Sequence, residues 1–236
     1  MPEASNLRRV AHAAFQTDVA LELAIQRCIA ANVDMIEIDV AGPPHSPELV
    51  VAHDLEVLGR GGCPSFDSVL DIARERFADH VRLNVDIKAS GYEEAVVAAL
   101  RERGLSDRVL ISTTEERSLE LLRRRHPRIS LGWSLPRTRR NPLLNPVTAL
   151  PALGVLTYVR HALPGVAANR IRRGEIDAVM AHWRLVTPRL AREIRRAGGE
   201  LYAWTVDDAA RIASLERMGV TGVISNDPRL FDPLTG

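Results

Sequence analysis

Eight short runs rich in β-branched and aliphatic residues recur along this chain, and segments with helical patterns separate them. This alternation constrains the fold more than any other feature. We predict strands at residues 8–13, 34–40, 81–88, 108–113, 128–134, 176–183, 200–206 and 221–226. The runs are largely apolar, as expected for strands that helices cover. Eight strand–helix units in 236 residues predict a (β/α)₈ barrel, or TIM barrel, as a single domain over residues 1–236.

A doubly wound open sheet is the alternative with the same alternation. The first predicted strand leads into "AHAAFQTD", which has no glycine and therefore no dinucleotide- or phosphate-binding loop. This absence favours the barrel. Residues 135–175 are rich in proline, and we expect them to form an elaborated, irregular loop and helix after the fifth strand.

Two helix starts are marked by polar residues. Ser65 precedes apolar residues at helical spacing, which predicts that it caps a helix. Asp207 is predicted to begin another helix, which stops at Gly219.

The composition excludes several classes of function. Arginines are scattered among acidic residues and the formal net charge is +1, so no nucleic-acid surface or polybasic membrane anchor is expected. No apolar run approaches the ~18 residues of a transmembrane helix, and the first residues lack a hydrophobic signal segment. We therefore expect a cytoplasmic protein. The sequence leaves its oligomeric state open.

Polar side chains occur near the ends of the first two predicted strands. His12 lies close to the end of the first strand. Glu37 and Asp39 are two residues apart on the second strand, so their side chains project to the same side. A short extended segment, "ELVVAHD", brings His53 to the same region. Active sites of such barrels lie at the C-terminal ends of the strands, which makes these residues site candidates.

The third predicted strand, "VRLNVDIK", adds three more polar side chains on one face: Asn84, Asp86 and Lys88. Lys88 is the single lysine in a chain with 30 arginines. A lysine offers a compact charge on a slim stem, whereas a guanidinium is a broad fork. This position therefore favours a role that arginine does not fill.

If these side chains face inward, three carboxylates, two histidines and one lysine converge. Carboxylates crowded in a barrel repel one another. A divalent cation would remove this repulsion, and an all-oxygen ligand set favours Mg²⁺ or Ca²⁺ over zinc. The alternative is that each carboxylate pairs with an arginine or lysine and no metal binds.

Six stretches resemble motifs of the glycerophosphodiester phosphodiesterase family, whose barrel is shared more distantly with phosphatidylinositol phospholipases C. They are "VAH" (10–12), "ANVDMIEIDV" (31–40), "ELVVAHDLEVLGRGG" (48–62), "LNVDIKA" (83–89), "LYAWTVDD" (201–208) and "GVTGVISNDP" (219–228). They follow the family's order. The resemblance implies a phosphoric diester hydrolase that cleaves glycerophosphodiesters, or lysophospholipid head groups, into an alcohol and glycerol phosphate.

The resemblance also implies roles for the matching residues. The metal would be held by Glu37, Asp39 and Asp86. His12 and His53 would be the general acid and base, since imidazole exchanges protons near neutral pH. Lys88 would face a phosphate oxygen, and the metal would polarise the phosphoryl group. The family reaction passes through a cyclic phosphodiester that water then opens.

The sequence departs from the family pattern at several positions. Ala13 and Ala14 follow His12 where the family has arginine and glycine, and that arginine helps to hold phosphate. Asp86 stands where the family has glutamate. Its shorter side chain requires a shifted site, a bridging water or Ca²⁺. Two other functions therefore stay open: a barrel that binds a phosphorylated ligand without catalysis, and a phospholipase that acts on a non-glycerol head group.

Two features predict a substrate-binding mouth. Arg137, with Arg139 and Arg140, follows the fifth strand and could replace the missing phosphate clamp. The three tryptophans fall near the ends of strands five to seven: Trp133, Trp183 and Trp204. Together they predict an aromatic wall for an apolar or cationic head group. The resemblance gives Trp204 the place of the tryptophan in the family's "WT" motif.

Overall fold

The computed structural model describes residues 7–12, 18–43, 48–52, 62–135 and 146–231; for residues 18–21 and 146–154 only the backbone is described. The elements are β1 (Arg8–His12), α1 (Asp18–Ala30), β2 (Met35–Ala41), β3 (Val50–Val51), α2 (Phe66–Arg76), β4 (Arg82–Ile87), α3 (Glu93–Glu102), β5 (Val109–Thr113), α4 (Glu116–Arg125), β6 (Ser130–Ser134), α5 (Pro146–Arg172), β7 (Ala178–His182), α6 (Pro188–Arg196), β8 (Glu200–Trp204), α7 (Ala209–Met218) and β9 (Gly222–Ser225).

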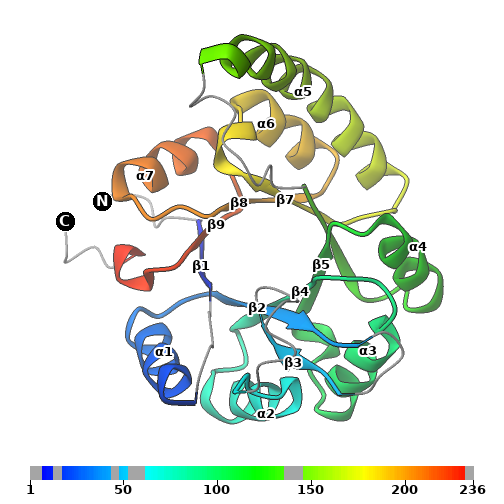
Figure 1. Ribbon diagram of the computed structural model, residues 1–236, viewed down its shortest axis with the longest axis vertical. Coiled ribbons are helices and arrows are strands. Elements are labelled where there is room, and N and C mark those ends of the chain that lie inside the picture. Colours follow the sequence, from blue (N-terminus) through cyan, green and yellow to red (C-terminus); the bar gives the residue numbers. More distant parts are fainter. Residues whose placement is uncertain (1–6, 13–17, 44–47, 53–61, 136–145, 232–236) are drawn as a thin grey trace.

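Eight parallel strands close into a barrel. β1 pairs with β9 on one side and with β2 on the other, which joins the two edges of the sheet. The short β3 is additional and runs antiparallel to β2. Helices α1 to α7 surround the strands (Figure 1). The predicted (β/α)₈ barrel is confirmed, and each predicted strand lies within two residues of its observed bounds.

Two parts of the chain differ from the regular strand–helix order. After β9 the described chain forms a four-residue 3₁₀ helix, Pro228–Phe231, instead of an α-helix. The region predicted to be irregular is largely the 27-residue α5, and residues 136–145 before it lie outside the described residues. α5 packs against α6 and buries Leu163 and Ile171. This packing stabilises a helix that contains an interior proline, Pro164.

The barrel interior is layered. Its middle is an apolar cluster of Val10, Met35, Leu110, Ala178, Met180, Tyr202 and Ile224. At the N-terminal ends of the strands, Glu200 forms ion pairs with Arg8 and, at 3.3 Å, with Arg82, and it accepts a hydrogen bond from the Tyr202 hydroxyl at 2.9 Å. Charged side chains at this end are thus separated by apolar residues from those at the C-terminal end.

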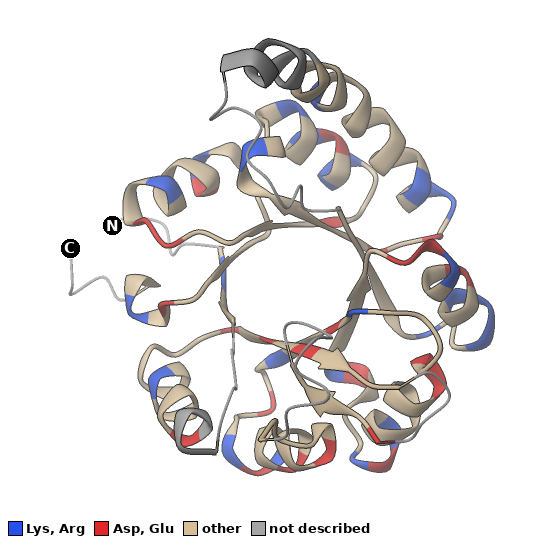
Figure 2. Cartoon of the chain, in the orientation of Figure 1, with Lys and Arg blue, Asp and Glu red and all other residues tan. Residues whose placement is uncertain are grey.

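A larger apolar layer lies between the strands and the surrounding helices. Ser65 caps α2 as predicted, since its hydroxyl accepts a hydrogen bond from the backbone N–H of Ser68 at 3.1 Å. Most acidic and basic residues lie on the outer helices (Figure 2). Within the described residues, no helix has the length and apolar character needed to cross a membrane.

Candidate active site

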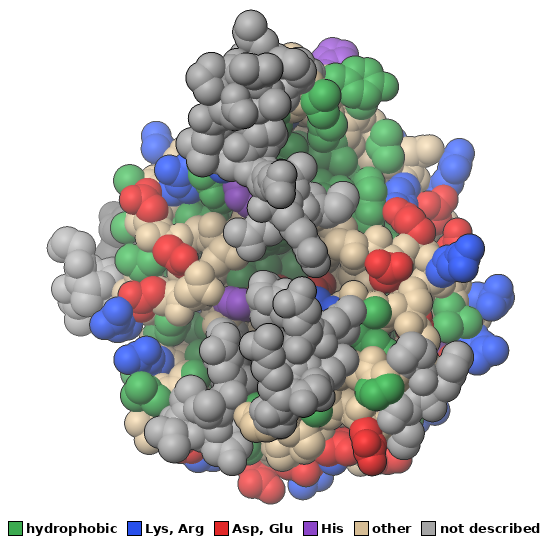
Figure 3. Space-filling model, viewed as in Figure 1, with side chains coloured by type: hydrophobic (Ala, Val, Ile, Leu, Met, Phe, Trp, Pro, Cys, Tyr) green, Lys and Arg blue, Asp and Glu red, His purple; other side chains and the backbone are tan. Residues whose placement is uncertain are grey.

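His12 ends β1 and is held at both ring nitrogens. Nε2 lies 3.2 Å from Oδ2 of Asp39, and Nδ1 lies 2.8 Å from Oδ1 of Asn226. Burial lowers the pKa of His12, but the hydrogen bond to Asp39, the charges of Glu37 and Asp39 and the hydrogen bond to Asn226 raise it to about 9. His12 is therefore an imidazolium near neutral pH, with a proton that it can donate. In Figure 3 histidine side chains are visible near the centre of the face that is drawn.

Asn226 is oriented by Asp207. The Asn226 side chain donates through Nδ2 to Oδ2 of Asp207 at 2.7 Å, and its backbone N–H donates to Oδ1 at 2.8 Å. Because the amide nitrogen is engaged by Asp207, the amide oxygen faces His12. The prediction that Asp207 begins a helix was wrong by one residue: Asp208 caps α7 by accepting from the backbone N–H of Arg211 at 2.7 Å.

Lys88 follows β4 and lies between two carboxylates. Its Nζ is 2.7 Å from Oδ1 of Asp39 and 2.7 Å from Oδ2 of Asp86. Burial lowers the pKa of Lys88, but the charges of Asp86 and Asp39 and the hydrogen bonds to both raise it above its ordinary value. Tyr92 fixes the backbone here: its hydroxyl accepts from the N–H of Lys88 at 3.2 Å and donates to the carbonyl of Val40 at 2.9 Å. Lys88 is thus charged, and it is held at its backbone by Tyr92 and at its ammonium by two carboxylates.

Asp86 is also held by two serines that were not singled out in the sequence. Its Oδ1 accepts hydrogen bonds from the hydroxyls of Ser112, at 2.6 Å, and Ser134, at 3.1 Å. Both serines are buried, at 1% and 8% exposure. A serine in an apolar strand carries no signature of its own. Ser112 can be identified from the strand register, in which it is the direct partner of Asp86 between β4 and β5.

Glu37 is the least compensated carboxylate of the site. Between described residues, no hydrogen bond or ion pair to Glu37 is found. Burial raises its pKa to about 7; His12 and Lys88 lower the value, while the neighbouring charges of Asp39 and Asp86 raise it further. Its register partner Asn84 is fully buried, and neither amide atom of Asn84 has a hydrogen-bond partner in the described part of the chain.

The donor types at this end of the barrel fit a hard divalent cation. They are carboxylate and amide oxygens, which Mg²⁺ and Ca²⁺ prefer, and a cation would offset the repulsion that raises the pKa of Glu37. The arrangement is not that of a ready metal centre, because no three His, Cys, Asp or Glu side chains in the described ranges are grouped to hold an ion. The alternative of charge pairing describes Asp39 and Asp86, which both contact Lys88, but not Glu37.

Trp133 does not join the predicted aromatic wall. Trp133 lies one residue before the inward-facing Ser134, packs with the outer apolar layer, and has the guanidinium of Arg170 4.5 Å from its ring centre. Successive strand residues face opposite sides, so Trp133 points away from the barrel interior. Only Trp204, among the three tryptophans, packs against the interior apolar cluster.

Trp183 does not pack against that cluster, but His182 links it to Trp204. Its ring lies 5.3 Å from that of His182, whose ring also meets Trp204 edge-on at 5.3 Å. The guanidinium of Arg211 lies 3.6 Å from the Trp183 ring centre. Trp183 is thus already packed against other side chains.

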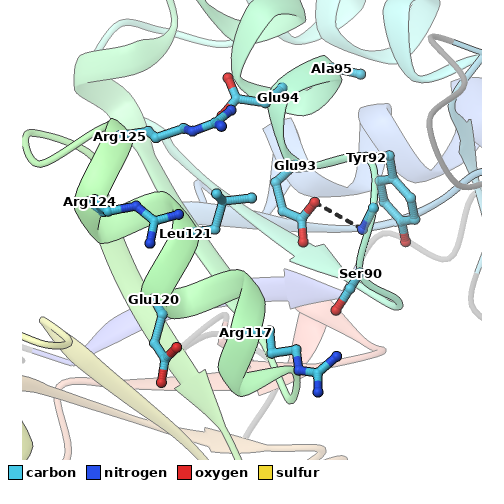
Figure 4. A pocket seen from close by; sticks show the side chains of 11 residues that line it. Ser90, Tyr92, Glu93, Glu94, Ala95, Arg117, Glu120, Leu121, Arg124 and Arg125 are labelled. Atoms are coloured by element: carbon cyan, nitrogen blue, oxygen red, sulfur yellow. Dashed lines mark hydrogen bonds and ion pairs between the residues drawn. The ribbon is translucent and has the colours of Figure 1, made fainter.

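Two predicted site residues, His53 and Arg137, lie outside the described residues. A pocket of about 890 Å³ is present elsewhere, between α3 and α4 (Figure 4). It is lined by Ser90, Glu93, Arg117, Glu120 and Leu121, among others, and Glu93 there accepts from the backbone N–H of Gly91 at 2.9 Å. None of the predicted site residues lines this pocket.

Comparison with known proteins agrees with the barrel fold. The model of the glycerophosphoryl diester phosphodiesterase family matches residues 79–230. The chain belongs to this family. The matched range contains Asp86, Lys88 and Asn226, whereas His12, Glu37 and Asp39 precede it.

Relatives and solved structures carry the same family name. The chain is 32% identical over 151 residues to "Probable glycerophosphodiester phosphodiesterase 2" of Mycobacterium tuberculosis, which covers 62% of this chain and 52% of that protein. The chain thus spans about half the length of this relative. A glycerophosphodiester phosphodiesterase from Parabacteroides distasonis superposes with a TM-score of 0.70 at 14% identity, covering 98% of both chains. An Oleispira antarctica phosphodiesterase in complex with the product sn-glycerol-3-phosphate gives 0.67 at 17% identity, again covering 98% of both. These structural likenesses show the fold.

Proposed function

We propose that this protein is a phosphodiester hydrolase that cleaves glycerophosphodiesters to an alcohol and glycerol phosphate. One observation carries the proposal: a single carboxylate, Asp39, joins His12 and Lys88. Oδ2 faces the imidazole at 3.2 Å and Oδ1 faces the ammonium at 2.7 Å. A proton donor and a fixed cation therefore stand side by side at the barrel mouth. Family membership, and the product bound to the Oleispira antarctica phosphodiesterase, support this substrate class.

Lys88 is suited to bind the phosphate. An ammonium has three N–H donors; one is donated to Asp86, and a second side of the ammonium is taken by the ion pair with Asp39. The third is available to a phosphate oxygen. The Lys88 side chain is 20% exposed, so its charge is reachable from solvent while its position is fixed. A fixed charge of this kind stabilises the negative charge of a phosphoryl transition state without reorganisation.

His12 is suited to protonate the leaving alcohol. The contact at Nε2 is longer than the contact at Nδ1, so Nε2 can release its proton while Asn226 still holds the ring. In the first step a hydroxyl of the glycerol attacks phosphorus, the bond to the alcohol oxygen breaks, and His12 gives that oxygen a proton. In the second step water attacks phosphorus and gives a proton to neutral His12; the ring bond between phosphorus and the attacking oxygen of the first step breaks, and that oxygen takes back the proton held by the base. His53 is the candidate base that removes the proton from the attacking hydroxyl.

A divalent cation, Mg²⁺ or Ca²⁺, is the cofactor that the donor set suits. Glu37, Asp39 and Asp86 are the residues that would hold it. When bound, the cation would neutralise charge on the phosphoryl oxygens.

A second candidate function is the binding of a phosphorylated ligand without turnover. It is favoured by Ala13, which stands where the family pattern places a phosphate-holding arginine. In that case Lys88 and His12 would hold a phosphate, and no alcohol would leave.

A substrate panel with a metal series tests the two functions. Purified protein is incubated with glycerophosphocholine, glycerophosphoethanolamine or glycerophosphoglycerol, with Mg²⁺, Ca²⁺ or a chelator, and glycerol phosphate is measured. We expect release that depends on the cation and is lost in His12→Ala. Binding of glycerol 3-phosphate by calorimetry, without release from any of the diesters, would instead support the second candidate.

A further inference from the structure

Asp86 receives hydrogen bonds from both sides of its carboxylate. Oδ1 accepts from Ser112 of β5 and Ser134 of β6, and Oδ2 accepts from the Lys88 ammonium. The strand order is β6, β5, β4, β2, so the two serines lie on the side of Asp86 that is remote from β2. The lysine is shared with Asp39, which lies on β2. The carboxylate of Asp86 is therefore tied to β5 and β6 by one oxygen and to the ammonium by the other.

The reach of Ser134 depends on a glycine. Gly132 is the register partner of Ser112 and occupies the inward position one step below Ser134 on β6. A Cβ at Gly132 would lie 3.1 Å from Cβ of Ser112, closer than ordinary contact, and 3.4 Å from Cγ of Met180, at the limit of ordinary contact. Because this position has no side chain, Ser134 can approach Asp86 across β5. The register and the glycine together place two hydroxyls on one oxygen.

We infer that Ser112 and Ser134 are positioning residues for Lys88: their hydroxyls fix Asp86 so that Asp86 and Asp39 clamp the ammonium between them. The inference rests on the proposed function, in which Lys88 faces the substrate phosphate. An ionised carboxylate makes stronger hydrogen bonds than a neutral group, so two serine donors give Asp86 a defined orientation. The shorter side chain of aspartate keeps this carboxylate close to the serine strands.

The clamp has a direct consequence for substrate binding. With both hydroxyls removed, Asp86 can rotate, and the ammonium loses its fixed direction. The substrate phosphate then meets a cation that must be ordered again on binding, which costs affinity. We expect a higher KM for the Ser112→Ala/Ser134→Ala double variant, by about tenfold, which corresponds to the loss of one charge-assisted hydrogen bond.

Ser118 provides a matched control. It is a fully buried serine on α4 that donates to a buried carboxylate, Glu93, and its hydroxyl lies 3.0 Å from that of Ser90, but it has no hydrogen bond to Asp86 or Lys88 among the described residues. Ser118→Ala removes the same chemical group at similar burial. A purely structural effect of a lost serine hydroxyl would be seen in this variant as well.

Because the chain has a single lysine, NMR can test the position of the Lys88 ammonium directly. Protein labelled with ¹⁵N-lysine has one side-chain ammonium, that of Lys88, and its NMR signal reports how tightly the three protons are held. We expect a protected, slowly exchanging signal in the wild type and in Ser118→Ala, measured with a chelator present. In the double variant we expect proton exchange about tenfold faster or a signal broadened beyond detection.

The outcomes separate this inference from the proposed function. If the Lys88 signal of the double variant equals that of the wild type, or if Ser118→Ala changes it equally, the inference is overturned whatever the kinetics show. If the signal is lost selectively and KM rises while Ser118→Ala keeps the wild-type KM, the inference is supported. If the wild type hydrolyses none of the diesters, the proposed function fails, and the NMR comparison still decides whether the serines position Lys88.

Discussion

His12 and Asn226 are separated by 214 positions in the sequence, and yet Nδ1 of His12 lies 2.8 Å from Oδ1 of Asn226. His12 ends β1, and Asn226 follows β9, which pairs with β1 where the barrel closes. The surroundings of His12, the proposed proton donor, are therefore completed only when the last strand docks on the first. Asp207 fixes the amide, so three segments contribute to one imidazolium.

The first prediction concerns the pKa of His12. Asn226→Ala removes an acceptor that favours the protonated ring, and a hydrogen bond to a charged group contributes about 1.5–3 kcal/mol. We expect the pKa of His12 to fall from about 9 by roughly one unit or more. The alkaline limb of kcat should move to lower pH by the same amount. An NMR titration of the His12 ring and a pH–rate profile measure both shifts.

Asn226→Asp is the matched variant with the opposite sign. It keeps an oxygen near Nδ1, loses the hydrogen bond from Nδ2 to Asp207 and adds a negative charge, so the pKa of His12 should rise relative to the wild type where both carboxylates are ionised. If both variants leave the pKa unchanged, Asn226 does not stabilise the imidazolium, and the acid role assigned to His12 loses its physical basis.

The second prediction is that Lys88→Arg folds normally but loses most activity. The compact ammonium lies 2.7 Å from each of two aspartate oxygens. A guanidinium keeps the charge, but its broad planar fork cannot occupy the same point and still direct a donor at the phosphate. We expect kcat/KM to fall by about 100-fold, or ~3 kcal/mol of transition-state stabilisation, with a Tm within a few degrees of the wild type.

Lys88→Met separates charge from shape. It leaves Asp39 and Asp86 without their shared cation, and breaking a buried ion pair costs about 3–5 kcal/mol. We expect this variant to be clearly less stable than Lys88→Arg by urea denaturation. Full activity in Lys88→Arg would show that any cation serves here and would refute the need for a lysine.

The strand order and the inward faces of β1, β2 and β4 followed from the sequence because they depend on local patterns. Apolar runs mark the strands, and a period of two places Glu37 with Asp39 and Asp86 with Lys88. The same period would have excluded Trp133 from the mouth, since it neighbours the inward-facing Ser134. The three tryptophans were grouped by their position along the strands and not by their parity.

Contacts across the barrel could not be predicted in the same way. Ser112 reaches Asp86 through the register of β4 and β5, and Asn226 reaches His12 through closure of the barrel. Neither register nor closure is encoded in a short stretch of sequence. The helix cap was missed for a different reason. Asp207 and Asp208 are adjacent, and either aspartate could accept from the helix N-terminus, so the sequence alone does not choose between them.

The third prediction concerns stability at the opposite end of the barrel. Burial raises the pKa of Glu200, but hydrogen bonding and charge from Arg8, the charge of Arg82 and a hydrogen bond from Tyr202 lower it below its ordinary value. Glu200→Gln leaves two arginines facing each other, and we expect a loss of about 2 kcal/mol at pH 7. A lowered carboxyl pKa stabilises above the unfolded pKa, and this contribution is lost as pH falls through the folded value. Urea denaturation at pH 7 and pH 3 measures the difference.

Activity provides the control for Glu200→Gln. The apolar layer of the barrel lies between Glu200 and the candidate active site. We therefore expect kcat and KM of the folded variant to match the wild type. A large loss of kcat without a loss of stability would contradict the assignment of this ion-pair group to folding alone.

The final prediction concerns Glu37, whose contribution to stability falls as pH rises, opposite to that of Glu200. The pKa of Glu37 rises from 4.5 to about 7, first through burial, so the folded protein binds this proton more tightly than the unfolded chain. The contribution of Glu37 to stability is therefore greatest below pH 4.5 and is lost as pH rises to about 7. Glu37→Gln removes the least compensated charge of the site. With a chelator present at pH 8, we expect this variant to be more stable than the wild type by about 1–3 kcal/mol, and at pH 4 we expect no gain.

An exposed glutamate with the opposite pKa shift and an added cation complete this test. Burial raises the pKa of Glu94, but hydrogen bonds from His126 and Arg125 lower it below its ordinary value, so Glu94→Gln should gain no stability at pH 8. Mg²⁺ or Ca²⁺ should raise the Tm of the wild type, because a ligand that binds only the folded state stabilises it. The same cation should raise the Tm of Glu37→Gln much less, since the variant lacks a charged donor. An equal rise in Tm in both proteins would remove Glu37 from the proposed metal site. If Glu37→Gln is less stable than the wild type at pH 8, the charge of Glu37 is compensated in the folded protein, and the prediction is wrong.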